Sequence, residues 1–203
     1  MRKLIKEKKM DKIVDKDIFD FLKVACFGNY SDPVKTASDS AYKDMCRTLR
    51  LKDTPYSVRH ELRTEITQML NVEIDKLPSI KSQEEFDEWH FILSKNIRKK
   101  YLENNISFTY GQAQKWINMT IKYLYILEAQ TFDEVFGFLH IPIDNYILAA
   151  VNKQFGIKYP DIPWSRWDDY FNIYLDFQNK IRSKVTDIEP LRWEFRNWIK
   201  YAK

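Results

Sequence analysis

Glycine occupies only four of the 203 positions, residues 28, 111, 137 and 156. Helix-favouring residues are abundant between them, and no run of alternating β-branched residues is bounded by turn residues. Hydrophobic residues make up 44% of the chain and aromatic residues 15%, which is enough for a packed core. The sequence therefore predicts an all-α fold, a single compact multi-helix domain, and excludes a largely disordered chain.

The same composition excludes several kinds of site. Four isolated glycines cannot build a GxxxxGK or GxGxxG phosphate loop, and the two cysteines and three histidines do not have zinc-ligand spacing. We therefore expect no cofactor and no metal. No apolar stretch approaches the roughly 20 residues of a membrane span, and the charged start does not resemble a secretory signal. We expect no membrane partner and a cytoplasmic location with reduced thiols.

Helical periodicity and capping residues predict where the helices lie. Ser57 and Ser82 are candidate N-caps, the latter within an S-Q-E-E capping box, and Pro190 suits a first helical position. Gly28 and Gly156 are expected helix ends. The expected helices cover about 15–27, 37–51, 57–75, a segment from 82 onward, 110–128, 132–138, a segment ending at 156, 167–184 and a segment from 190.

Charge is distributed unevenly along the chain. Residues 1–12 hold six basic and two acidic side chains, which equals the net charge of +4 for the whole sequence. We therefore divide the chain into a basic tip, 1–12, and one helical domain, 13–203. Within that domain, residues 95–122 carry six bases against one acid, whereas residues 128–194 carry eleven acids against seven bases. The sequence predicts a positive region separate from a negative one.

The positive region has two interpretations. A polyanion such as DNA would contact its lysines and arginines and release counterions, which predicts salt-dependent binding through Arg98, Lys99, Lys100, Asn118 and Lys122. Alternatively, the three consecutive cations of residues 98–100 complement the negative end of the preceding helix and need no ligand.

Four of the six tryptophans lie in the last forty residues. Trp193 and Trp198 are five positions apart on one expected helix and point in different directions, so we interpret them as core anchors. Trp164 and Trp167 lie in a proline-flanked loop and helix start, and they are the better candidates for the wall of an exposed pocket that stacks on a base.

The expected helix 110–128 carries polar residues on an apolar frame. Lys115, Asn118 and Lys122 follow at i, i+3 and i+7 and so share a stripe of the helix. Asp144 lies in HIPIDNYIL at an expected helix start, where its carboxylate would cap free N–H groups. That capping role alone could explain Asp144, and an exposed or hydrogen-bonded amine could explain Lys115.

This arrangement resembles the helix-hairpin-helix DNA glycosylases, and their 8-oxoguanine-type members in particular. The resemblance covers about 108–150: Gly111 corresponds to the hairpin glycine, Lys115 to the nucleophilic lysine and Asp144 to the carboxylate of a P-x-D motif. It implies that Lys115 attacks the sugar C1′ of an extruded nucleotide and that Asp144 assists departure of the base. The sequence departs from the family in having one hairpin glycine and a 29-residue separation between Lys115 and Asp144.

Two other functions remain open from the sequence. One is a helical DNA- or RNA-binding protein without enzymatic activity. The other is a helical interaction protein, for instance of a mobile element or a defence system, that contacts another protein through its basic tip and tryptophan-rich end. An all-helical scaffold hosts too many functions for the fold alone to decide between them and a glycosylase.

Overall fold

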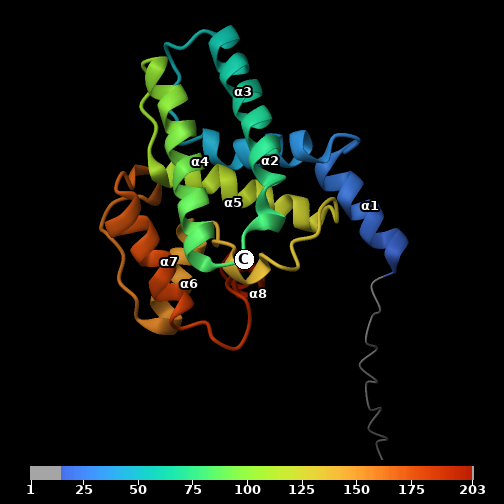
Figure 1. The fold of residues 1–203 in the computed structure, drawn as a ribbon, viewed down its shortest axis with the longest axis vertical. Helices are drawn as coiled ribbons and strands as arrows, with labels where there is room; N and C mark the ends of the chain where they lie inside the picture. Colours follow the sequence, from blue (N-terminus) through green and yellow to red (C-terminus); the bar gives the residue numbers. More distant parts are fainter. Residues whose placement is uncertain (1–14, 203) are drawn as a thin grey trace, which may run out of the picture.

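The structure is a computed structural model that describes residues 15–202 of the chain. Within this range the regular elements are all helical, as predicted from the sequence (Figure 1). The basic tip, 1–12, lies outside the described residues. The elements are α1 (Lys16–Phe27), α2 (Pro33–Cys46), α3 (Tyr56–Ile74), η1 (Leu77–Ser79), α4 (Gln83–Glu103), α5 (Tyr110–Ile126), η2 (Phe136–Phe138), α6 (Asn145–Phe155), η3 (Trp164–Arg166), η4 (Tyr170–Leu175), α7 (Asp176–Arg182) and α8 (Pro190–Tyr201).

Several local signals act as the sequence predicts. Ser82 caps α4 by accepting a hydrogen bond from the Glu85 N–H, and Gly156 ends α6 with a left-handed φ of 66°. The N-cap prediction for Ser57 is wrong, because Ser57 lies inside α3, which begins after Pro55. The helix expected at 167–184 is present over residues 170–182, but its first half is a π-helical segment, η4, that continues into α7.

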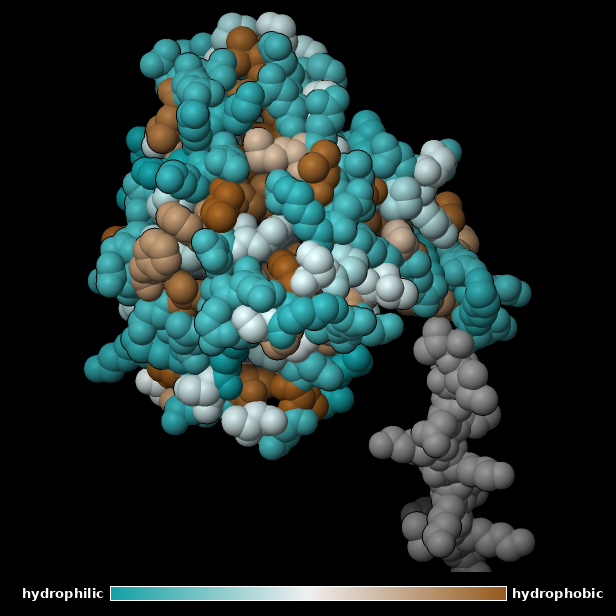
Figure 2. Space-filling model, in the orientation of Figure 1, coloured by the Kyte–Doolittle hydropathy of each residue, from teal (hydrophilic) through white to brown (hydrophobic). Residues whose placement is uncertain are grey.

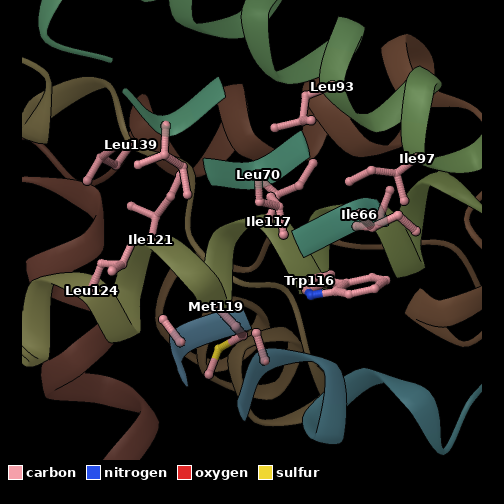
Figure 3. Close-up of a cluster of buried hydrophobic side chains, with 14 of the residues drawn as sticks. Ile66, Leu70, Leu93, Ile97, Trp116, Ile117, Met119, Ile121, Leu124 and Leu139 are labelled. Atoms are coloured by element: carbon pink, nitrogen blue, oxygen red, sulfur yellow. The ribbon is translucent and has the colours of Figure 1, made fainter. Parts of the chain in front are cut away.

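Helix α5 is the centre of the fold. Every residue from Gly111 to Lys122 is buried, and α2 packs along the helix while α4 crosses it. A large apolar cluster forms around α5, with side chains from α3 and α4 directed toward it (Figure 3). A second apolar cluster joins α6, η4, α7 and α8. In Figure 1, α6, α7 and α8 lie in the lower part of the molecule, whereas the start of α3 and the end of α4 lie at the top. Because α5 adjoins both groups of elements, a polar residue on α5 is enclosed between them.

The first turn of α5 is joined to the segment around η3. Thr109 and Gln112 form a capping box, and the Thr109 hydroxyl also donates to the Ser165 carbonyl at 2.8 Å. The Gly111 N–H donates to the Trp167 carbonyl at 2.8 Å. A Cβ at position 111 would lie 1.9 Å from the Trp164 carbonyl oxygen, so only glycine permits this close approach.

We expect Gly111→Ala to lower the free energy of unfolding by about 2–3 kcal/mol, because the added methyl group must push the η3 backbone away. Gly137→Ala is the matched control, since a Cβ there meets no atom within 4 Å. It should be neutral or slightly stabilising. Urea denaturation of both variants measures the difference, and equal unfolding free energies would show that the contact at position 111 is unimportant.

Hydrophilic residues cover most of the face shown in Figure 2, with apolar residues in scattered positions. Among residues 15–202, no helix combines the length and the apolar character that crossing a membrane requires.

Candidate functional site

Lys115 and Asp144 are brought together although 29 residues separate them in the sequence. Lys115 Nζ lies 2.8 Å from Asp144 Oδ2. Lys115 comes from the second turn of α5, and Asp144 is the N-cap of α6, where its Oδ1 accepts a hydrogen bond from the Ile147 N–H at 3.0 Å. The capping role predicted for Asp144 is confirmed, and its second carboxylate oxygen is left to face the lysine.

The carboxylate of Asp144 has a third partner. Trp198 of α8 donates from its indole Nε1 to Asp144 Oδ2 at 3.1 Å. Burial raises the pKa of Asp144, but the charge of Lys115 and the donated hydrogen bonds outweigh burial, so the pKa lies below its ordinary value. Asp144 is therefore an anion at neutral pH, held at a fixed position by groups from three helices.

This pair lies on the wall of a pocket with a volume of about 760 Å³, within the range of small-molecule sites. The Lys115 side chain is 7% exposed and that of Asp144 15%, so both are mostly enclosed. Aromatic side chains form much of the remaining wall, which also includes one arginine. Lining residues include Arg47, Thr48, Lys115, Met119, Lys122, Tyr123, Asp144, Trp164, Phe195 and Trp198.

A second buried ion pair adjoins this pocket, and its lysine, Lys122, lines the wall. Lys122 Nζ lies 2.7 and 2.8 Å from the two carboxylate oxygens of Glu194 on α8. The ammonium also lies 4.7 Å from the Phe195 ring centroid and 5.7 Å from that of Trp198. Burial raises the pKa of Glu194, and the attraction of Lys122 offsets this only in part. By pairing with Glu194, Lys122 holds α8 in the position from which Trp198 donates its hydrogen bond to Asp144.

The loop that delivers Asp144 is held by buried amide side chains. Gln114 donates to the Ile143 carbonyl and accepts from the Ile143 N–H, both at 3.1 Å. Asn118 donates to the Ile141 carbonyl at 3.2 Å, and Gln178 of α7 also bonds Ile141. Helix α5 thus carries the lysine and two of the side chains that fix the position of its carboxylate partner.

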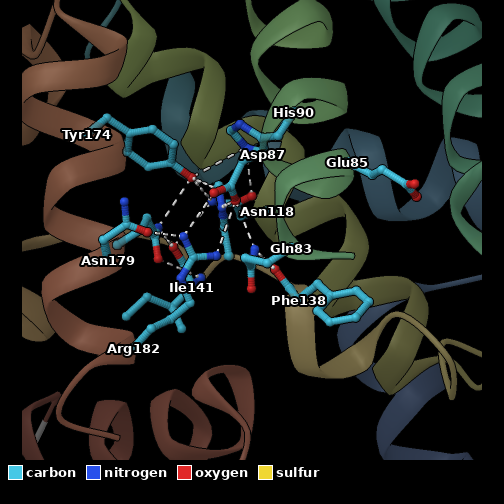
Figure 4. A network of polar contacts seen from close by, with 12 residues as sticks. Gln83, Glu85, Asp87, His90, Asn118, Phe138, Ile141, Tyr174, Asn179 and Arg182 are labelled. Atoms are coloured by element: carbon cyan, nitrogen blue, oxygen red, sulfur yellow. Dashed lines mark hydrogen bonds and ion pairs between the residues drawn. The ribbon is translucent and has the colours of Figure 1, made fainter. Parts of the chain in front are cut away.

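Behind this loop lies a network of buried polar groups (Figure 4). Asp87 of α4 lies 2.7 Å from His140 Nε2 and 3.0–3.1 Å from two nitrogens of Arg182. His140 Nδ1 and the Asn118 amide both contact the Tyr174 hydroxyl of η4, at 2.8 and 3.0 Å. Burial lowers the pKa of His140 despite the neighbouring Asp87. The network is enclosed and joins α4, α5, η4 and α7 around the start of the Asp144 loop.

The cations predicted to bind nucleic acid all have partners within the protein. Arg98 pairs with Asp168 at 2.8 Å, Lys99 with Glu103 at 3.7 Å and Lys100 with Glu65 at 2.9 Å. Asp144, Asp168 and Glu194 belong to the acidic segment 128–194. The prediction of separate positive and negative regions is wrong, because the fold packs the acidic segment against the basic one.

The prediction that three polar residues of α5 share one side of the helix holds for Lys115 and Lys122 but not for Asn118. Lys115 and Lys122 line the pocket, whereas Asn118 is buried in the network with His90, Gln114 and Tyr174. Asn118 is therefore not available to a nucleic acid, and its role is to hold the Asp144 loop.

Two of the four C-terminal tryptophans have the roles predicted for them, and the other two have opposite roles. Trp164 lines the pocket as expected. Trp167 does not, because it is fully buried and packs on Phe177. Trp198, which we expected to be a core anchor, lines the pocket, whereas its helix neighbour Trp193 is buried as predicted.

Sequence reasoning missed the contributions of α8 to the site. These contributions come from Glu194, Phe195 and Trp198, which are spaced at i, i+1 and i+4. Trp198 was expected to be a core residue, and no local sequence feature links the three to Lys115. Their spacing places them on one side of a helix, which was the only available signal. Within the described residues, no group of three or more His, Cys, Asp or Glu side chains could hold a metal ion.

Comparison with known proteins adds no assignment. No protein-family model matches this chain, and no curated protein or solved structure is significantly similar to it. The site must therefore be interpreted from its own geometry.

Proposed function

We propose that the chain binds DNA and acts as a base-excision DNA glycosylase with lyase activity, with Lys115 as the nucleophile and Asp144 as the assisting carboxylate. One observation carries the proposal: a lysine and an ionised aspartate lie 2.8 Å apart in a pocket of about 760 Å³ with tryptophans on its wall. Catalytic groups must converge on one cleft. Lys115 and Asp144 do so, although the sequence places them on two different expected helices.

The residue types suit the proposed chemistry. The bond between C1′ and the base nitrogen breaks, and its electron pair leaves with the base. A proton from the Lys115 ammonium passes to the departing base, which frees the Nζ lone pair to bond to C1′. The Asp144 carboxylate stabilises the positive charge that develops on the sugar, because it is held within 2.8 Å of Nζ in a largely water-excluded position.

The next step produces a trappable adduct. A proton on Nζ is transferred to O4′ as the C1′–O4′ bond opens, and a protonated Schiff base between Lys115 and C1′ remains. Its formation requires a nucleotide turned out of the duplex. Trp164, Phe195 and Trp198 are among the aromatic groups on the pocket wall, and we propose that they stack on the extruded base.

Borohydride trapping tests the proposal. The unaltered chain should give a covalent complex with duplexes containing 8-oxoguanine or an abasic site, and Lys115→Gln should lower its yield at least 100-fold. Glutamine can still donate to Asp144, so the pocket should stay folded, which circular dichroism checks. Lys95→Gln, at an exposed lysine of α4, is the matched control and should trap normally. If the unaltered chain and Lys115→Gln trap equally little, the proposal fails.

Asp144→Asn should separate the two steps of the reaction. Asparagine caps helices about as well as aspartate, so α6 should keep its start. Without the negative charge, release of 8-oxoguanine should slow by about 10²–10³-fold, whereas trapping on an abasic duplex, which has already lost its base, should fall less than tenfold. Single-turnover assays on the two duplexes measure this difference. Equal losses on both would show that Asp144 does not assist departure of the base.

A further inference from the structure

The segment that follows α2 carries cations without acidic partners. Residues 47–59 contain four basic side chains, Arg47, Arg50, Lys52 and Arg59, and one acid, Asp53. Within the described part of the chain, none of these four cations lies within 4 Å of a carboxylate or donates a side-chain hydrogen bond. This sets the segment apart from the end of α4, where Arg98, Lys99 and Lys100 are each paired.

Arg59 also lacks a partner within the described residues. Its Nε is shielded from solvent and donates no hydrogen bond to any of them, so an anion can contact the guanidinium only through its other two nitrogens. The side chain lines a second pocket of about 510 Å³ beside Lys52 and Arg63. Arg63 pairs with Asp39, but Lys52 and Arg59 are left for an anion. Tyr42 and Tyr56 also line this pocket.

The segment also reaches the Lys115 pocket. Arg47 and Thr48 line it, whereas Leu49, Leu51 and Lys52 line the second pocket. Neighbouring residues of one short segment therefore contribute to both pockets.

We propose that residues 47–59 form the phosphate-binding surface that carries a DNA strand to the Lys115 pocket, with Arg47 on the wall of that pocket and Lys52 and Arg59 around a phosphate in the second pocket. This inference rests on the proposed function, since it assumes that the occupant of the Lys115 pocket is a nucleotide of DNA. It moves the backbone contacts from the end of α4 to the connection between α2 and α3 and the first turn of α3.

Fluorescence anisotropy with a labelled abasic duplex, titrated at several salt concentrations, tests the surface. The triple variant Arg47→Gln/Lys52→Gln/Arg59→Gln should bind 100-fold more weakly at low salt, and the slope of log affinity against log salt should become shallower by about 2–3. The matched triple Lys95→Gln/Lys99→Gln/Lys100→Gln removes the same charge from α4 and should change affinity less than threefold.

A charge-conserving variant guards against misfolding. Arg47→Lys/Arg59→Lys keeps the positive surface and should bind within about threefold of the unaltered chain, as expected for contacts that are mainly electrostatic. A larger loss for the α4 triple than for the 47–59 triple overturns the inference while leaving the glycosylase proposal intact. Lack of salt-dependent binding by the unaltered chain overturns it as well. Normal binding with no borohydride adduct would instead keep the surface and contradict the enzymatic function.

Discussion

Replacing Lys122 with methionine is expected to lower the free energy of unfolding by about 3–5 kcal/mol. The methionine side chain fills similar space but leaves the Glu194 carboxylate, whose side chain is 1% exposed, without its cation. Removing one partner of a buried ion pair costs this much because the remaining charge is desolvated and unpaired. Urea-induced unfolding at neutral pH measures the change. A loss below 1 kcal/mol would show that Glu194 finds another partner or becomes neutral without cost.

The pH dependence of this variant provides the control. Burial already raises the pKa of Glu194, and loss of Lys122 should raise it further. A carboxyl group whose pKa is higher in the folded state contributes stability that is present below its unfolded pKa and lost as the pH rises through the folded pKa. The difference between Lys122→Met and the unaltered chain should therefore shrink toward pH 4.5. Adding Glu194→Gln should recover much of the stability at neutral pH.

Asp87→Ala should have the second large effect, a loss of about 3–5 kcal/mol. Asp87 accepts from both nitrogens of the Arg182 fork and contacts His140, and removing it strands an arginine that is only 16% exposed. Glu88→Ala removes an exposed acid at the next position of α4 and is the matched control, with an expected change below 0.5 kcal/mol. Urea denaturation measures both, and equal effects would show that the buried network contributes little.

The Asp87 variant also tests the link between the network and the site. His140 begins the loop that ends at Asp144, so loosening it should disturb the Lys115 pair even if the protein stays folded. We expect trapping by folded Asp87→Ala to fall well below that of Glu88→Ala at equal folded fraction.

Features encoded over a few residues were predictable from the sequence. The cap at Ser82, the αL glycine at 156, the N-cap role of Asp144 and the start of α8 at Pro190 depend on side chains and backbone groups one to four positions apart. The pairing of Lys115 with Asp144 could be suspected only through a family resemblance, since their distance depends on how α5 and α6 pack.

The failed predictions depend on tertiary contacts. On an ideal helix, Lys122 lies about 20° from Lys115, whereas Asn118 lies about 60° away, and this turn is enough to move Asn118 from the pocket to the buried network. The spacing defines a stripe but not where the pocket ends. Trp198 and Glu194 reach the site only because α8 packs beside α6. Charge sums along the sequence likewise do not show that Asp168 and Glu65 neutralise the end of α4.

The central claim, that Lys115 forms the covalent bond to the sugar, is tested most directly by mass spectrometry of the borohydride-trapped adduct. Trypsin does not cleave after a modified lysine, so an adduct at Lys115 should appear as the uncleaved peptide 101–122 carrying the sugar remnant, with fragmentation placing the added mass on Lys115. The account predicts this peptide and its absence from Lys115→Gln. An adduct on any other lysine, or separate unmodified peptides 101–115 and 116–122 from the purified complex, would contradict it.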